Sequence, residues 1–394
     1  MSEPSIVRPL AVLSTATFVS IATMRVADPL LPQVAQEFDV TVGDASIVAT
    51  AFALAYGIFQ LFYGAFGDRF GKYRLVVLAT LVSALTVLPA AFADSIGALG
   101  LARFASGATA AAIVPLSFAF IGDHVPYRDR QTVLARFLTG TILGVIAGQV
   151  FGGVIGDLIG WRAVFLLLSA LFLLVGILLA FELRSARVPP PILTRSISPA
   201  SFLRGYALLF RRPWVRVVLA VVFIESFLFW GGFTFIGAFL RSRFELDYTI
   251  IGLFLGCMGL GGILYALSVR RLVRSLRERG LSLWGGALIA LGFLAVGLGP
   301  LPAMAPAIVL LGLGLYMLHN TLQTNATQMA PETRGLAVST FASALFYGQA
   351  AGVWLCGLAV DRIGYRPVFI VLGAALLACG VVFALLLARR PVAD

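Results

Sequence analysis

The sequence has 394 residues, of which 60% are hydrophobic and only 12% are charged, with a formal net charge of +11. A soluble globular chain usually has about 25% charged residues, so this composition excludes an ordinary water-soluble domain. Apolar runs of about 20 residues, the length that a helix needs to cross a bilayer, recur along the whole chain. The composition therefore indicates an all-α polytopic membrane protein, with the lipid bilayer as its solvent.

Hydropathy predicts twelve membrane-spanning helices. The first apolar run lacks a convincing signal-peptide cleavage site, so we interpret it as an uncleaved helix. The predicted spans are residues 10–33, 45–67, 74–93, 97–121, 132–156, 162–182, 215–240, 249–269, 281–299, 306–329, 336–360 and 367–388.

The basic residues predict the orientation of the chain. With the N-terminus inside, most of the 29 Lys and Arg residues fall in cytoplasmic segments. This asymmetry follows the positive-inside rule and predicts that both termini are cytoplasmic, in a bacterial inner (plasma) membrane. The basic surplus is therefore a topology signal directed at anionic headgroups, and it does not indicate nucleic-acid binding.

The first predicted span contains two charges near its outer end. Arg25 and Asp28, in MRVADPLLP, lie one helical turn apart. They form either a self-contained ion pair, or a site in which Asp28 pairs with Arg103 of the fourth span or titrates within a cavity.

The junction of the second and third spans concentrates charge and glycine in GAFGDRFGKYR, residues 64–74. It resembles the signature loop of the major facilitator superfamily, G-x-x-x-D-R-x-G-R-R, although Tyr73 occupies one basic position and Arg74 follows it. The resemblance implies a cytoplasmic latch in which Asp68 meets the positive N-terminal end of the eleventh span, near Gly335. The matching residues are Gly64, Asp68, Arg69, Gly71 and Lys72.

The fourth span contains Arg103, followed by Gly107 in a run of small residues. An arginine at the centre of a span costs about 2.5–3.5 kcal/mol on insertion scales, so it is normally paired or functional. The pair resembles the helix-four motif of the same superfamily, which implies a part in proton coupling. A structural salt bridge is the alternative.

The fifth span has glycine at nearly every fourth position, which lines one helix face and permits close helix packing. The stripe resembles the motif of the drug:proton antiporter branch, G-x-x-x-G-x-x-x-G-P-x-x-G-G, with Gln149 in place of the proline. Glycine packing alone also explains it. The residues are Gly140, Gly144, Gly148, Gln149, Gly152 and Gly153.

The chain divides into two halves with matching sequence. DLIGWRAVF, residues 157–165, and DRIGYRPVF, residues 361–369, each join the fifth and sixth spans of a half, and we interpret both as tight turns. A Pro- and Arg-rich segment separates the halves, and its residues 202–210 form a short surface helix in our prediction. The predicted divisions are 1–183 and 214–394 as six-helix bundles and 184–213 as the linker. Parallel repeats of this kind suit alternating access.

The seventh span places Glu225 near mid-membrane without a basic neighbour in its own segment. A carboxyl group in that environment favours its neutral form, which suits a proton carrier, whereas a hydrogen-bonded packing role is the alternative. In the tenth span, His319 begins a polar stripe that indicates a water-lined wall, and it either titrates or is held by a hydrogen bond. The cavity candidates are Arg25, Phe229, Trp230, Tyr316, Asn320 and Gln323.

The resemblance covers essentially the whole chain and implies the major facilitator fold, two pseudo-symmetric six-helix bundles. It implies a proton-coupled transporter, acting as a monomer on a small molecule and protons. We expect an exporter of amphipathic, drug-like molecules; uptake or efflux of an organic anion, sugar or other metabolite is the alternative. The sequence has no paired-histidine motif, nucleotide loop or Ser/His/Asp set, and its three cysteines lack metal-ligand spacing. We therefore expect no enzyme activity, cofactor or metal.

Overall fold

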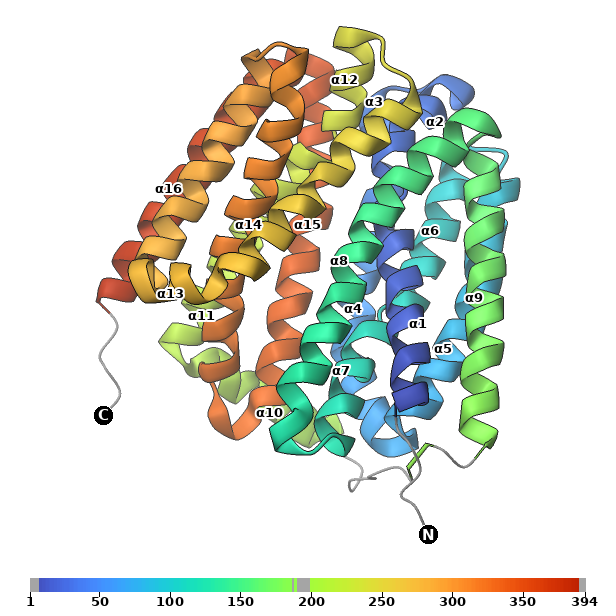
Figure 1. Ribbon diagram of the computed structural model, residues 1–394, viewed down its shortest axis with the longest axis vertical. Helices are drawn as coiled ribbons and strands as arrows, with labels where there is room; N and C mark the ends of the chain where they lie inside the picture. Colours follow the sequence, from blue (N-terminus) through green and yellow to red (C-terminus); the bar gives the residue numbers. More distant parts are fainter. Residues whose placement is uncertain (1–6, 186–187, 190–198, 390–394) are drawn as a thin grey trace.

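The structure, a computed structural model, describes residues 7–185, 188–189 and 199–389, and its regular secondary structure in these ranges is helical. The helices form one elongated bundle (Figure 1). Eleven of them are long and apolar enough to cross a membrane. One of these, α13 (Tyr248–Leu298), contains two predicted spans, because the helix continues through a non-helical residue at Arg277. The all-α, polytopic fold class is therefore confirmed.

The first half of the chain supplies six crossing segments. Its elements are α1 (Val7–Arg25), η1 (Asp28–Leu30), α2 (Leu31–Phe38), α3 (Val42–Ala45), α4 (Ile47–Phe70), α5 (Lys72–Val87), η2 (Leu88–Phe92), α6 (Ile96–Ala110), α7 (Ile113–His124), α8 (Tyr127–Leu158) and α9 (Trp161–Arg184). Most of its buried side chains form one hydrophobic cluster that extends from Leu10 to Leu179.

The rest of the chain begins with a helix at the predicted linker position and continues with the second half. Its elements are α10 (Pro199–Arg211), α11 (Pro213–Phe233), α12 (Ile236–Phe244), α13, η3 (Leu301–Ala303), α14 (Met304–Gln328), η4 (Pro331–Thr333), α15 (Arg334–Ile363) and α16 (Tyr365–Ala388). A second hydrophobic cluster, with Ala49 as its one member from the first half, extends to Leu387. The surface helix expected in the linker is confirmed as α10, whereas linker residues 186–187 and 190–198 lie outside the described residues.

Two of the predicted spans are broken where the sequence contains proline. α1 ends at Arg25 because Pro29 has no N–H to donate to the Arg25 carbonyl. α6 ends at Ala110, and Pro115 likewise withholds a donor from the next carbonyl. The break after α1 places Arg25 at the end of α1 and Asp28 at the start of η1, on either side of a two-residue turn.

The two ends of the bundle differ in how the halves meet. We call the end that carries the start of α1, α10 and the end of α16 the termini side, and the end that carries α2, α3 and α12 the far side (Figure 1). On the far side, α2 and α12 pack together and α3 packs on α15. Hydrogen bonds also join the halves there, as described below.

Candidate functional site

The structure brings Glu225 and His319 together from helices that are far apart in the sequence. Glu225 lies twelve residues into α11, which at 1.5 Å per residue is about 18 Å from the helix start and close to mid-membrane. Its Oε2 lies 3.0 Å from Nδ1 of His319 on α14. The sequence singled out both residues, but not the contact between them.

The two residues of this pair differ in their exposure. The Glu225 side chain is 1% exposed, and its Oε1 has no hydrogen-bond partner in the described part of the chain. The His319 side chain is 22% exposed and lies beside the ring of Phe341, 5.6 Å between ring centroids. The histidine is therefore the more accessible end of the pair.

A second polar cluster lies where α1 breaks. The Nη1 atom of Arg25 is 4.0 Å from Oδ2 of Asp28, and both residues are buried. Arg25 also reaches the second half: its Nη2 donates to Oε1 of Gln349 at 3.3 Å, and its guanidinium carbon lies 3.4 Å from the ring centroid of Trp230. The pair is therefore local to α1 and η1, as one interpretation of the sequence held, but Arg25 also joins the halves.

Gln149 completes this cluster from α8. Its Nε2 donates to Oδ2 of Asp28 at 2.8 Å, which is shorter than the contact between Asp28 and Arg25. The amide occupies the position at which the drug:proton antiporter motif has proline. The substitution thus supplies a hydrogen bond to a buried carboxylate, a role that no local sequence pattern indicates. Gln349 was also missed, because its partner is Arg25, on the opposite half of the chain.

Arg103 is held by backbone carbonyls and forms no salt bridge in the described residues. It is fully buried on α6, and it forms no ion pair with Asp28 in the described residues. Its Nε donates to the Val48 carbonyl and its Nη2 to the Thr23 carbonyl, both at 3.1 Å. The Thr23 carbonyl lies in the last turn of α1, where carbonyl oxygens have no helical N–H partner. Arg103 thus joins three helices through backbone acceptors and lies over the Phe52 ring, 4.3 Å from its centroid.

The other cavity candidates divide between two environments. Tyr316 and Asn320 are half-buried and Gln323 is exposed along one face of α14, which suits a polar wall within the membrane. Phe229 is fully buried and stacks on Phe233 inside the core of the second half. In this conformation Phe229 is therefore part of the hydrophobic core, and its role as a cavity contact stays a prediction.

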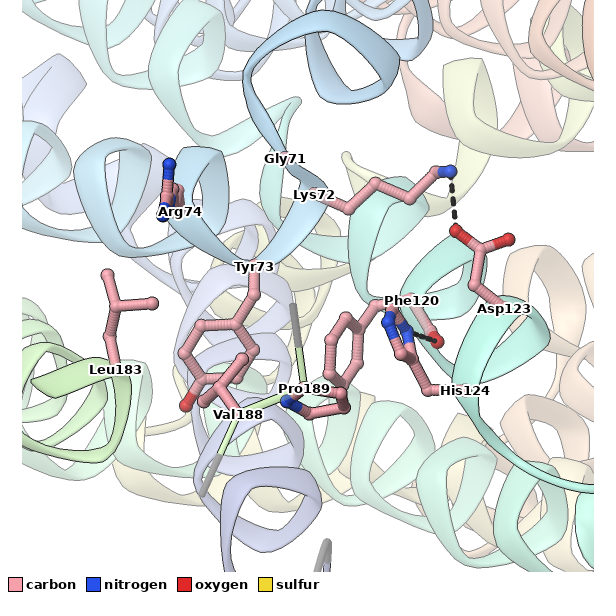
Figure 2. A pocket seen from close by; sticks show the side chains of 10 residues that line it. All are labelled: Gly71, Lys72, Tyr73, Arg74, Phe120, Asp123, His124, Leu183, Val188 and Pro189. Atoms are coloured by element: carbon pink, nitrogen blue, oxygen red, sulfur yellow. Dashed lines mark hydrogen bonds and ion pairs between the residues drawn. The ribbon is translucent and has the colours of Figure 1, made fainter. Parts of the chain in front are cut away.

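In the charged loop between α4 and α5, the ion pairs form with residues of the same half of the chain. Gly71 ends α4 with φ of 93°, and Lys72 begins α5. Lys72 Nζ lies 2.8 Å from Oδ1 of Asp68 and 2.6 Å from Oδ2 of Asp123. Figure 2 shows the second of these bonds beside a cavity of about 110 Å³ on the termini side, which Pro189 also lines.

The expected partner of Asp68 at the start of α15 is not engaged. Gly335 is exposed, and a side chain at this position would meet no heavy atom within 4 Å. Within the described residues, Asp68 forms no hydrogen bond or ion pair with α15; it pairs with Lys72 instead. Arg69 lies against its neighbour Phe70, 5.2 Å from the ring centroid. The contact that the resemblance implies is therefore not formed in this conformation, and the latch stays a prediction.

The glycine stripe of the fifth span packs α8 directly on α1. A methyl group at Gly144 would lie 2.9 Å from the Phe18 carbonyl oxygen, and one at Gly152 would lie 2.8 Å from that of Val26. Gly153 points elsewhere: a methyl group there would lie 2.9 Å from the Cα of Gly252 on α13. Close packing is therefore the observed role of the stripe.

Comparison with known proteins assigns the family. The family model described as Major Facilitator Superfamily matches residues 13–334 and 277–394. The chain belongs to the Major Facilitator Superfamily. A crystal structure of a bacterial homologue of the human lysosomal transporter Spinster, in an inward-facing and unoccupied conformation, superposes with a TM-score of 0.76 at 18% identity and covers 100% of both chains. This superfamily transporter is thus a multi-pass integral membrane protein.

Three curated relatives of this superfamily chain differ in their described roles. The uncharacterized MFS-type transporter YwfA of Bacillus subtilis is 26% identical, over 92% of this chain and 88% of its own. A bicyclomycin resistance protein homolog of Haemophilus influenzae is 28% identical over 57% and 58%. The probable sulfoacetate transporter SauU of Cupriavidus necator is 23% identical over 92% and 88%. Superfamily members are typically not enzymes.

Proposed function

We propose that this chain is a proton-coupled secondary transporter that exports small amphipathic molecules by alternating access. The two halves tilt about their interface, and the termini side faces the cytoplasm, as the distribution of basic residues predicts. The observation that carries the proposal is the buried contact between Glu225 and His319. The relative described as a bicyclomycin resistance protein homolog supports export.

The charge of the pair explains how a proton would couple to the transport cycle. With one shared proton, the pair is either a neutral acid beside a neutral imidazole or a carboxylate beside an imidazolium, and its net charge is zero in both forms. Loss of that proton leaves a net negative charge in the core of the second half, which is strongly unfavourable without water or a cation. The deprotonated pair therefore favours a conformation that hydrates it or admits a cationic substrate.

A second candidate substrate class is supported by the cluster at the α1 break. Arg25 and Arg103 are buried with Asp28, so these three charges sum to one positive charge. Arg25 Nη1 has no hydrogen-bond partner within the described residues, and the Trp230 ring lies over its guanidinium. A carboxylate or sulfonate would compensate this charge. The relative described as a probable sulfoacetate transporter is consistent with this alternative.

Flux in proteoliposomes tests the coupling. With an imposed proton gradient, the parent chain should accumulate substrate, whereas Glu225→Gln should retain exchange down the substrate gradient and lose accumulation. Thr324→Ala is a matched control for altered polarity on α14, because this exposed hydroxyl bonds to the Asn320 backbone carbonyl and is not a cavity candidate. Unchanged gradient-driven accumulation in Glu225→Gln would exclude Glu225 from the mechanism.

Thermal-shift measurements separate the substrate classes. A lipophilic cation such as tetraphenylphosphonium should raise the melting temperature if the first candidate is right, and sulfoacetate should do so if the second is. Arg25→Ala should abolish the shift with sulfoacetate and preserve the shift with tetraphenylphosphonium. A sulfoacetate shift that survives in Arg25→Ala would contradict the role given to Arg25.

A further inference from the structure

One short pattern occurs three times in the chain. Each copy reads G-x-x-x-D-x-x-G and joins one membrane span to the next: residues 64–71, 153–160 and 357–364. The last glycine of each copy has a left-handed backbone, with φ of 93°, 98° and 79° at Gly71, Gly160 and Gly364. These are the three positive-φ glycines of the described residues, and the conformation favours glycine in each turn.

The second copy joins the halves on the far side. Oδ2 of Asp157, at the end of α8, accepts hydrogen bonds from the Thr249 hydroxyl at 2.7 Å and from the Thr249 backbone N–H at 3.3 Å. Thr249 lies in the first turn of α13, where N–H groups lack helical acceptors and negative charge is favoured. The Gly153 contact with Gly252 lets the two helices cross closely enough for this bond.

The third copy repeats the arrangement with the halves exchanged. The carboxylate of Asp361, at the end of α15, accepts from the Thr41 hydroxyl at 2.7 Å and from the Gly43 backbone N–H at 3.1 Å. A methyl group at Gly357 would lie 3.0 Å from the Cα of Gly43, so glycine again permits the crossing. The tight turns expected from the sequence are therefore also contacts between the halves.

The first copy, on the termini side, lacks such a contact. A side chain at Gly64 would meet no heavy atom within 4 Å, and Asp68 is paired with Lys72. The sequence at the start of α15 nevertheless repeats the residues that donate hydrogen bonds in the third copy. Thr333 precedes Gly335 by two residues, as Thr41 precedes Gly43.

We propose that Asp157 and Asp361 are far-side latches that alternate with the Asp68 contact implied by the family resemblance, an inference that rests on the transporter function proposed above. Asp157 and Asp361 hold the far side closed in this conformation. Asp68 binds the Thr333 hydroxyl and the Gly335 N–H only after those two contacts have opened.

The geometry of α4 and α15 gives the reason for alternation. Asp361 binds just before the far end of α4, whereas Asp68 lies at its termini end. A helix of 24 residues is about 36 Å long, so α4 would have to lie along α15 over its whole length for both contacts to form. Such an arrangement closes both sides at once and leaves no path for a substrate. Alternating access therefore needs one contact open whenever the other is closed.

Distances between spin labels test the far-side latches. In a cysteine-free chain, labels at Leu158→Cys and Leu298→Cys report the far side, because these exposed residues end α8 and α13. Asp157→Ala combined with Asp361→Ala should increase the ratio of long to short distances roughly tenfold, the effect of losing charge-assisted hydrogen bonds of more than about 1.4 kcal/mol.

A second label pair tests the exchange of latches. Labels at Phe181→Cys and Leu385→Cys, exposed near the termini ends of α9 and α16, should move closer in the same double variant. Adding Thr333→Val should reverse that approach, because it removes the hydroxyl that Asp68 would bind. Approach that persists with Thr333→Val would overturn the assignment of Thr333.

A matched control and a milder variant complete the design. Asp94→Ala removes an exposed aspartate between α5 and α6 that lies outside the repeated pattern, and it should leave both distances unchanged. Thr41→Val with Thr249→Val removes the two hydroxyl donors and keeps both aspartates, although it also removes the bond that the Thr41 hydroxyl accepts from the Asp44 N–H at the start of α3. It should shift the far-side distances in the same direction by a smaller factor even if the aspartate variants unfold. Unchanged far-side distances in this variant or the folded aspartate variant would overturn the proposal. The labels need neither substrate nor a proton gradient, so this failure is distinct from loss of coupled flux in Glu225→Gln.

Discussion

The contacts of Arg103 predict that its main contribution is to the stability of the first half. In Arg103→Ala, the Val48 and Thr23 carbonyl oxygens each lose a donor in a region that water does not reach. The variant also leaves a void beside Phe52, against which the guanidinium packs.

The size of the stability loss in Arg103→Ala follows from these contacts. The Thr23 carbonyl, left without a donor, costs about 1–3 kcal/mol, loss of the bond to the Val48 carbonyl, which keeps its helical partner in α4, costs about 0.5–1.5 kcal/mol, and the void adds to that cost. Relief from burying a charged guanidinium acts in the opposite direction. We therefore expect a net loss of about 3 kcal/mol in the free energy of unfolding, which is roughly a 100-fold change in the folding equilibrium.

Unfolding by dodecyl sulfate in mixed micelles, followed by tryptophan fluorescence, measures this loss. Arg103→Lys should recover part of the stability, because an ammonium group can reach one carbonyl but cannot donate to both as the planar guanidinium does. Ser106→Ala, on the same helix, is the control, since that hydroxyl bonds to backbone carbonyls without carrying charge. Arg103→Ala with parental stability and selectively lost proton coupling would refute this reasoning and favour the coupling role.

Two further predictions concern α8. Gly148→Ala should destabilise the protein by about 1–3 kcal/mol, because the methyl group would lie 2.5 Å from the Ala22 carbonyl oxygen; Gly140→Ala, whose methyl group has 3.6 Å to its nearest oxygen, should be neutral in the same melting assay. Gln149→Leu should cost about 1–2 kcal/mol by removing the hydrogen bond to Asp28, and the effect should largely disappear in an Asp28→Asn background. Equal melting temperatures for the two glycine variants, or full additivity of the Gln149 and Asp28 changes, would contradict these predictions.

The sequence predicted the fold well because membrane spans leave a strong local signal. Apolar runs, the proline- and arginine-rich linker and the glycine spacing of α8 are all readable within short windows. The breaks in the first and fourth spans were missed, although Pro29 and Pro115 mark them. Length and hydropathy average over a span and therefore hide a single interrupted turn.

The candidate site was only partly predictable because its contacts are non-local. Glu225 and His319 were each singled out by burial of a titratable group, but their contact depends on how α11 packs on α14. Arg103 was noticed as an isolated charge, yet its acceptors are backbone carbonyls, which carry no residue-specific signal. Gln149 was treated as a missing proline, since only the fold places it beside Asp28.

The contacts on the two faces of α8 determine how a displacement of one helix is transmitted to its neighbours. On one face, Gly144 and Gly148 bring its backbone close to backbone carbonyl oxygens of α1. On the other, Gly153 meets α13, which belongs to the opposite half. Gln149 lies one turn before Gly153 and binds Asp28. A displacement at the crossing of α8 and α13 would therefore be transmitted along α8 to within a few ångströms of the buried Asp28 carboxylate, because no loop lies between the two sites.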